Sequence, residues 1–334
     1  MRSRDGARRS CLWMPARARA TWSECAVRSS HPTTPAVTPH RAPRMVRSRP
    51  VRDAAFDIVA DMDRNAQDPS PGLAAAAAPI AAWWLGRTRY RDAWELQHRL
   101  VAARAAGSIG DQLLLLEHEP VLTLGRHSDP SHVLASPAEL AARNIELIRT
   151  ERGGEVTYHG PGQLTAYPIV RLADRSLFVR SFVRALEAAL SETCAAFGVE
   201  AAPKEGFPGC WCAAGTRKIG AVGVRVEHGV TYHGVALNVS VRLADFDLID
   251  ACGMPGIEST SIARERDEAA EPPTESVAQA APEFALALAR ALRAPLAGTL
   301  PPRSDPARSR RDLDALLADT AHRSALATPS GARR

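Results

Sequence analysis

The sequence predicts one globular domain that mixes α-helices with β-strands and lies between two polar tails. Residues 90–106 and 178–197 place apolar side chains at helical spacing. Around these two segments lie short apolar runs bounded by Gly or Pro, which are typical of buried strands. Two further runs, within residues 218–239, are joined by a two-residue turn, as in a β-hairpin. The expected fold therefore contains both element types in one folded region.

The charge of the chain is distributed unevenly. Of the net charge of +5, residues 1–52 carry +10 and residues 301–334 carry +3, which leaves −8 for residues 53–300. An acidic body does not support nucleic-acid binding. No run of eighteen apolar residues predicts a membrane span. We therefore expect neither nucleic acid nor a membrane as a partner.

The two ends of the chain are predicted to be disordered. Residues 1–70 form a basic extension rich in Arg, Ser, Pro and Ala, without apolar periodicity. One interpretation of the extension is a transit peptide, because it is Arg-rich and poor in acidic residues. The other is a segment upstream of the true start of translation, which would then be Met45 or Met62. Residues 301–334 form a second polar tail, so that the folded domain is expected over residues 80–300. The six cysteines have neither disulfide-framework nor zinc spacing, which favours a reducing compartment, and we expect the cytoplasm.

The elements expected in chain order follow from periodicity and from Gly or Pro boundaries. Helices are predicted over 90–106, ended by Gly107, and over 134–143, 178–197 and 284–292. Strands are predicted over 112–117, 121–124, 146–150 and 164–170. The segment 264–282 is charged and is expected to be a loop.

The hairpin expected over residues 218–239 places a lysine at its open end. If Glu227 pairs with Val230, Lys218 lies opposite Val239. The chain leaves the hairpin at that end and reaches Cys252 thirteen residues later. Lys218 and Cys252 can therefore meet.

The segment Arg152–Gln163 has the composition of a ligand-binding loop. Four glycines and a proline in twelve residues exclude an ordinary helix or a long strand. Glycine lets another group approach the bare backbone, so this segment is predicted to form a wall against a ligand. The alternative is an ordinary cluster of surface turns.

Cys252 and Lys218 are candidates for nucleophilic catalysis. A thiol attacks only as the thiolate, and a nearby amine can raise the thiolate fraction and carry the proton. The chain has only two lysines, Lys204 and Lys218. Gly253 follows Cys252 and leaves a backbone N–H available for an oxyanion. The alternative for Cys252 is an inert buried thiol.

Two histidines, His159 and His233, each lie in the tetrapeptide Thr-Tyr-His-Gly. With Cys252 they could bind zinc in principle, but the spacing of these residues does not indicate a metal site. No metal is therefore expected.

Three stretches of the sequence resemble the lipoyl(octanoyl) transferases. These stretches are RGGEVTYHGPGQLTAYPIV, PGCWCAAGTRKIGAVGVRVEHGVTYHGVALNV and the Cys-Gly at 252. The resemblance runs from WLGRTRYRDAWELQ, which looks like the opening helix of the family, to about Ile262. It implies an α+β fold, a mixed β-sheet with flanking helices, like the catalytic domain of biotin and lipoate protein ligases.

The resemblance also implies a reaction. Such enzymes move an octanoyl group from octanoyl-acyl carrier protein to a lysine on lipoyl domains of 2-oxoacid dehydrogenase complexes or on the glycine-cleavage carrier protein. Cys252 would hold the octanoyl group as a thioester, Lys218 would be its base and acid, and no cofactor or ATP would be needed. The substrate-binding residues implied are Arg152, Gly153, Gly154, Glu155, Val156, Thr157, Tyr158, His159, Ala221, Val222, Gly223, Gly234, Val235 and Ala236.

The sequence leaves other functions open. An ATP-dependent lipoate or biotin protein ligase would share the fold but would need an adenylate site and no nucleophilic cysteine. A non-catalytic acyl-binding protein would need neither Cys252 nor Lys218, and a transferase working between lipoyl domains would use a different donor. The sequence departs from the family at Ala251, usually proline, and at Cys210 and Cys212, usually small apolar residues.

Two arginine clusters are candidate docking sites for an acidic carrier protein, or else ordinary solvated faces. The first comprises Arg87, Arg89 and Arg91, and the second Arg171, Arg175, Arg180 and Arg184.

Overall fold

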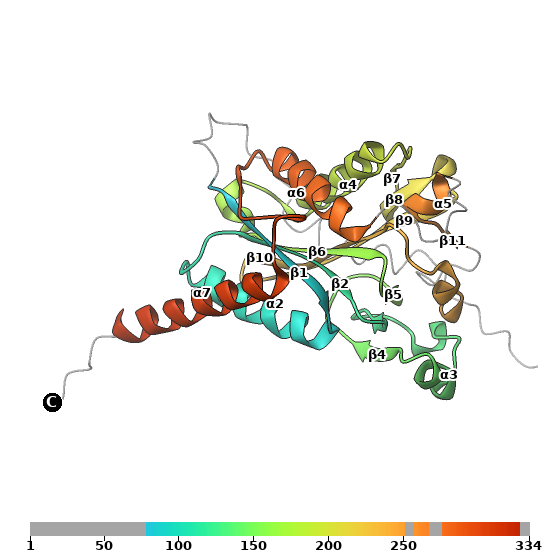
Figure 1. Ribbon diagram of the computed structural model, residues 1–334, viewed down its shortest axis with the longest axis horizontal. Coiled ribbons are helices and arrows are strands. Elements are labelled where there is room, and N and C mark those ends of the chain that lie inside the picture. Colours follow the sequence, from blue (N-terminus) through green and yellow to red (C-terminus); the bar gives the residue numbers. More distant parts are fainter. Residues whose placement is uncertain (1–77, 251–256, 267–275, 328–334) are drawn as a thin grey trace, which may run out of the picture. The chain divides into compact units, whose positions relative to one another are not determined.

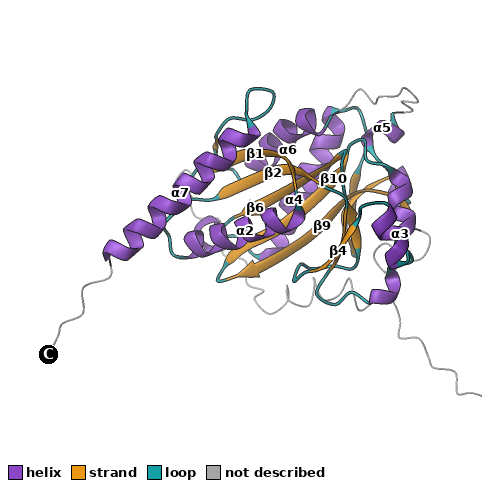
Figure 2. Cartoon of the chain, turned by 60° about the horizontal axis from the view of Figure 1, so that its bottom comes forward, coloured by secondary structure: helices purple, strands orange, loops and turns teal. Residues whose placement is uncertain are grey.

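The computed structural model describes residues 78–250, 257–266 and 276–327, the last seven of them as backbone only. A mixed sheet runs through this region in the strand order β12-β1-β2-β6-β10-β9-β8-β7, with β11 also paired to β9 (Figures 1 and 2). The strands are β1 (Ile80–Thr88), β2 (Gln112–His118), β6 (Gln163–Ile169), β7 (Ala202–Lys204), β8 (Phe207–Cys212), β9 (Arg217–Glu227), β10 (Val230–Asn238), β11 (Glu258–Ser259) and β12 (Leu296–Ala297). The pairings β1–β2, β1–β12 and β9–β11 are parallel, and the others are antiparallel.

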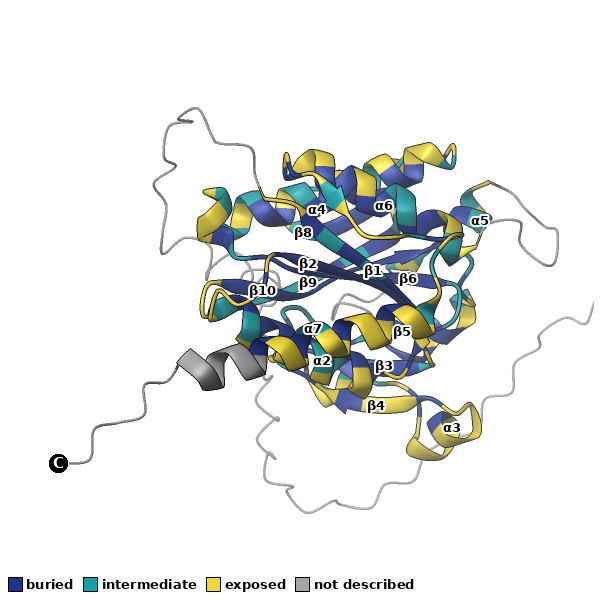
Figure 3. Ribbon diagram, turned by 60° about the vertical axis from the view of Figure 1, so that its left-hand side comes forward, coloured by how far each residue is buried: buried dark blue, intermediate teal, exposed yellow. Residues whose placement is uncertain are grey.

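Helices cover both faces of this sheet. Figure 3 shows α4 (Val179–Ala196) and α6 (Val277–Ala291) on one face, and α2 (Tyr90–Ala105) and α7 (Pro306–Ala327) on the other. Each face has its own buried apolar cluster, one beneath α4 and α6 and one beneath α2 and α7. Burying both faces removes the most apolar surface from water, which is the main force that stabilises such a layered domain. The prediction of a mixed α+β fold is confirmed.

A smaller sheet lies beside the main one. Its order is β4 (Glu146–Arg149), β3 (Val121–Leu124) and β5 (Thr157–His159), and α3 (Pro137–Ala142) lies next to β4. Ser136 caps α3 by accepting a hydrogen bond from the Glu139 N–H at 3.2 Å, and Pro137 occupies the first turn. The remaining elements are short: α5 (Ile262–Glu265) and the 3₁₀ turns η2 (Pro130–His132), η3 (Leu172–Arg175), η4 (Ala213–Gly215) and η5 (Leu243–Leu248).

The predicted register of the hairpin is confirmed. Glu227 pairs with Val230, and the pairing continues to Gly220 with Leu237. His228 and Gly229 have φ of 50° and 76°, the conformation of a tight turn that matches the twist of the strands. Lys218 lies two residues beyond the last pair, at the open end of the hairpin.

Six strands were not predicted from the sequence: β1, β5, β7, β8, β11 and β12. In β1, Ile80, Ala82 and Trp84 face the α4/α6 cluster, while Trp83 and Leu85 pack on the α2/α7 cluster. Because both faces are buried, residues 80–85 are all apolar and have no alternation to detect. The segment 264–282 was expected to be a loop, but α6 begins at Val277 and contains Pro282.

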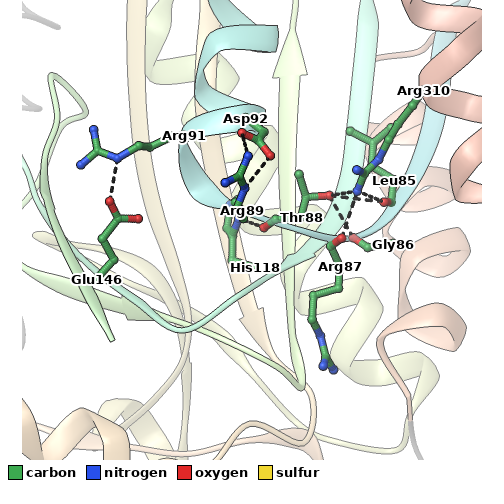
Figure 4. Close-up of polar contacts among 10 residues, drawn as sticks. All are labelled: Leu85, Gly86, Arg87, Thr88, Arg89, Arg91, Asp92, His118, Glu146 and Arg310. Carbon is green, nitrogen blue, oxygen red and sulfur yellow. Dashed lines mark hydrogen bonds and ion pairs between the residues drawn. The ribbon is translucent and has the colours of Figure 1, made fainter. Parts of the chain in front are cut away.

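The expectation of a disordered tail from residue 301 is wrong for the segment that forms α7. Leu313 is fully buried and Leu317 nearly so, both in the α2/α7 cluster. Arg310 Nη2 donates to the Leu85 carbonyl at 2.9 Å and to the Thr88 hydroxyl at 2.6 Å (Figure 4). The helix is ordered by contacts with residues more than 200 positions away, which its own polar composition does not reveal. The predicted extension over residues 1–70 lies outside the described residues.

No helix in the described part of the chain combines the length and the apolar composition needed to cross a membrane.

Candidate active site

The glycine-rich loop is tied to β3 by the side chain of Arg152. Its Nη2 donates to the carbonyls of Thr123 and Glu155, both at 2.6 Å, and its Nε donates to the Thr123 hydroxyl at 3.0 Å. A third nitrogen, Nη1, donates to the Gly153 carbonyl at 3.0 Å. The guanidinium therefore bridges two loop carbonyls to Thr123 of β3, a role that its five fixed donors suit.

Close backbone contacts explain why glycines surround this loop. A Cβ on Gly125 would lie 1.9 Å from the Gly154 carbonyl oxygen, which no side chain can tolerate. A Cβ on Gly223 would lie 3.0 Å from the Gly153 carbonyl oxygen. The Gly153 N–H also donates to the Val224 carbonyl at 3.4 Å. The loop is thus pressed against β9 on one side and against the end of β3 on the other.

A cavity of about 70 Å³ lies between the loop and the hairpin. Of the fourteen residues expected to bind substrate, all but Gly153 and Tyr158 line it, and Lys218 lines it as well. Tyr158 is buried in another cluster, with its ring edge-on to Phe246 at 5.6 Å. Four lining residues were not predicted: Tyr90, Thr165, Tyr167 and His233. Only His233 had a sequence signal, because its tetrapeptide repeats that of His159.

Two neutral histidines are buried here: His159 lines the cavity, and the His118 ring lies 5.8 Å from the His159 ring. His118 is fully buried between the Thr88 carbonyl (2.9 Å from Nδ1) and the Tyr167 hydroxyl (2.7 Å from Nε2), and burial lowers its pKa to about 4. The Nδ1 of His159 is 2.7 Å from the Gln163 Oε1, and burial lowers its pKa well below 6.5. The Tyr90 ring stacks on His159 with a centroid distance of 6.1 Å. Uncharged rings of this kind suit an apolar ligand.

His233 has a left-handed backbone conformation and a ring without a hydrogen-bond partner. Its φ is +54°, and its N–H donates to the Gln97 Oε1 at 2.7 Å. In the β6–β10 register it lies opposite Pro168, which has no N–H to offer. The ring is 1% exposed, has no hydrogen-bond partner at either nitrogen, and lies with its Nε2 3.6 Å from the Glu151 Oε1. Burial lowers the pKa of His233, although the Glu151 carboxylate opposes this effect.

Glu151 is held ionised beside this ring. Burial alone would raise its pKa, but contacts with His233 and Trp94 outweigh burial and lower the pKa to about 2. Trp94 Nε1 donates to the Glu151 Oε1 at 2.9 Å. No three His, Cys, Asp or Glu side chains in the described ranges are grouped as metal ligands.

Lys218 contacts the segment that follows Cys252 in the sequence. Ser259 pairs with Lys218 in parallel, and the Thr260 N–H donates to the Lys218 carbonyl at 2.9 Å. Cys252 itself, like Ala251, lies outside the described residues.

The first arginine cluster is charge-compensated. Arg89 Nε lies 2.9 Å from the Asp92 carboxylate and Arg91 Nε lies 2.6 Å from that of Glu146 (Figure 4). In the second cluster, the side chain of Arg175 is buried against Asp111. The pairings of Arg89, Arg91 and Arg175 fit the interpretation of ordinary solvated or structural arginines.

The chain is similar to proteins of known family over most of its described length. Residues 89–281 match the family described as the lipoyl protein ligase A/B catalytic domain. An octanoyltransferase from Chloroflexus aurantiacus is 47% identical over 211 residues, covering 62% of this chain and 95% of the relative. One from Acidobacterium capsulatum is 48% identical over 189 residues, covering 53% of this chain and 77% of the relative.

The fold likeness extends to a ligase. A putative lipoate protein ligase from T. acidophilum superimposes with a TM-score of 0.51 at 14% identity, covering 74% of this chain and 95% of the other. At that identity the likeness shows the fold alone, which confirms the lipoate-ligase-like architecture. The sequence matches carry the finer distinction, since the relatives above 40% identity are octanoyltransferases. The chain therefore belongs to the lipoyl protein ligase A/B catalytic family and, within it, to the octanoyltransferases.

Proposed function

We propose that this protein transfers an octanoyl group from octanoyl-acyl carrier protein to a lysine of a lipoyl domain. The observation that carries the proposal is the cavity between the glycine loop and the hairpin, with Lys218 in its wall, in a chain of octanoyltransferase sequence. The acceptors would be lipoyl domains of 2-oxoacid dehydrogenase complexes and the glycine-cleavage carrier protein. The reaction would take place in the cytoplasm.

The lining of the cavity suits an acyl chain. Val222, Val235 and Ala236 are buried apolar residues of β9 and β10 that line it, together with Gly223 and Gly234, which have no side chain. Each methylene of the chain that this lining removes from water contributes about 0.8 kcal/mol. Apolar contact of this kind holds an acyl chain without any charged partner.

The proposed chemistry proceeds in two halves. The thiolate of Cys252 attacks the thioester carbonyl of the donor, a new C–S bond forms, and the carrier thiolate leaves. Lys218 takes the proton from the Cys252 thiol and returns it to the departing carrier thiolate. The acceptor amine then attacks the Cys252 thioester, its proton passes to Lys218, and the thiolate of Cys252 is released.

The described residues support this assignment at Lys218. Ser259, the strand partner of Lys218, follows Cys252 by only seven residues. No oxidant, metal or nucleotide is needed for the bonds to balance, so we propose a reaction without ATP.

The test is the intact mass of the protein after incubation with octanoyl-acyl carrier protein in the absence of ATP, beside Cys252→Ala. We expect an octanoyl adduct on the parent that is absent from the variant and is discharged by a lipoyl domain. Octanoylation that required free octanoate and ATP, with no adduct on the parent, would replace this proposal with the ligase.

A further inference from the structure

The two lysines of the chain lie over one indole ring. Lys204 Nζ is 4.8 Å from the centroid of the Trp211 ring, and Lys218 Nζ is 5.1 Å from the same centroid. Both distances fall within the roughly 6 Å over which a cation is attracted to an aromatic face. In a chain with 42 basic residues, every lysine is therefore found at Trp211.

A β-bulge brings Lys218 to this ring. Cys210 pairs with Gly220, but the next residue, Trp211, pairs with Lys218, so that Ile219 is the extra residue. Residues directly paired in antiparallel strands share a face. Bulges commonly re-aim a side chain in this way. Without the bulge, Ile219 would lie opposite Trp211.

Trp211 is itself rigidly held. Its side chain is 3% exposed, and its Nε1 donates to the Phe207 carbonyl at 3.0 Å. Cys210 and Cys212 on either side belong to the cluster under α4 and α6. Strand alternation therefore turns Trp211 to the opposite face, which is the face where Lys218 lies.

Gly209 leaves room for the lysine stem. A Cβ there would lie 3.0 Å from the Lys218 Cε and 2.5 Å from the Gly220 carbonyl oxygen. The Gly209 N–H donates to the Glu187 Oε1 at 3.0 Å. Burial raises the pKa of Glu187, and the charge of Lys218 is among the effects that oppose this rise. The Lys218 side chain thus passes between the backbone of Gly209 and the indole ring of Trp211 before it reaches the cavity.

We propose that Trp211 is a positioning residue for Lys218, holding its ammonium at the cavity wall. The role of Trp211 in turnover rests on the proposed function, in which Lys218 carries the proton. The placement of the Lys218 ammonium by Trp211 is independent of that function. A lysine side chain has a flexible four-carbon stem, and a rigid aromatic face limits where its end can lie. An error of about 1 Å in such placement can cost on the order of a hundredfold in rate.

The placement is tested by NMR on the full chain labelled with ¹³C only in lysine, which gives two Hε–Cε signals. Lys204→Arg assigns them. We expect the Lys218 signal to be shifted by the indole ring current, to return toward the free-lysine position in Trp211→Leu, and to be shifted less in Trp211→Phe. The matched control is Phe207→Leu, because the Phe207 ring lies 4.8 Å from the Lys204 Nζ. It should move the Lys204 signal and leave that of Lys218 in place.

The role in turnover is tested by kinetics on the same variants. We expect Trp211→Leu to lower kcat about 10- to 100-fold with KM within about threefold, and Trp211→Phe to recover most of the loss. Phe207→Leu should keep the parent kcat. A Lys218 signal that does not respond to Trp211→Leu overturns the placement. A shifted signal with unchanged kcat overturns the positioning role. Parent protein that fails to transfer the octanoyl group from octanoyl-acyl carrier protein would instead refute the proposed function, while the NMR result would still stand.

Discussion

Asp111 is the centre of a buried charge network that can be broken by one substitution. Its carboxylate accepts hydrogen bonds from Arg104 Nε and Arg175 Nε, both at 2.6 Å, and from the Arg171 backbone N–H at 3.1 Å. The side chains of Asp111, Arg104 and Arg175 are 3%, 9% and 4% exposed. The network joins the end of α2, the start of β2 and the turn after β6. Asp111→Asn therefore leaves two guanidinium groups in a nearly dry site without their shared anion.

The expected loss follows from this burial. Removing one partner of a buried ion pair costs about 3–5 kcal/mol, because the other charge stays desolvated. For a domain of this size, 1 kcal/mol corresponds to about 2–4 °C in Tm, so Tm should fall by about 6–20 °C. Asp174 is the matched control: it also pairs with Arg104, but its side chain is 51% exposed, so Asp174→Asn should cost at most about 1 kcal/mol.

The assay is urea denaturation followed by far-UV circular dichroism, with Tm measured in parallel. Asp111→Asn should lower the unfolding midpoint without a change in slope, because the surface exposed on unfolding is the same. None of the network residues lines the cavity. Activity per folded molecule should therefore be retained at low temperature. If Asp111→Asn were as stable as Asp174→Asn, the network would not stabilise the fold as argued.

Acidity, one glycine and the helix α7 provide three further tests. The pKa of His118 is 6.5 when unfolded and about 4 in the fold, so the unfolded chain binds the proton first as pH falls. Its contribution of about 3 kcal/mol is complete above pH 6.5 and is lost as pH falls through 4. His118→Gln should flatten that part of the stability–pH curve, and an unaltered curve would contradict the assignment. Gly125→Ala must displace the Gly154 carbonyl, so we expect a loss of about 1–3 kcal/mol together with lower octanoyl loading in the intact-mass assay. Arg310→Ala removes the contacts of α7 with the end of β1 and should lower stability by about 1 kcal/mol, with activity unchanged at 25 °C. A drop in activity for Arg310→Ala without a drop in Tm would show that α7 affects the site directly.

Local chemistry was enough to predict several parts of this protein from sequence. The hairpin register followed from the two-residue turn His228-Gly229, because a turn of this length pairs the residues on either side of it, Glu227 and Val230. Helices α2 and α4 were predicted from apolar residues at helical spacing, because each helix buries one face and exposes the other to solvent. The family was predicted from the glycine-rich loop and from the segment around Lys218. The residues of each segment are close together in the sequence, and many of them also line the cavity.

Other parts depended on contacts between distant segments. Strand β1 has two buried faces, so its pattern carries no period, and α7 is ordered by the surface it covers. Tyr90, Thr165 and Tyr167 line the cavity only because α2 and β6 meet the hairpin there. His233 also lines the cavity, and its backbone N–H donates to Gln97, a contact that depends on how α2 packs on β10. The sequence by itself thus determined the motifs and their family. The packing of helices on both faces of the sheet decided which side chains complete the site, because burial is a property of the assembled layers and not of any one segment.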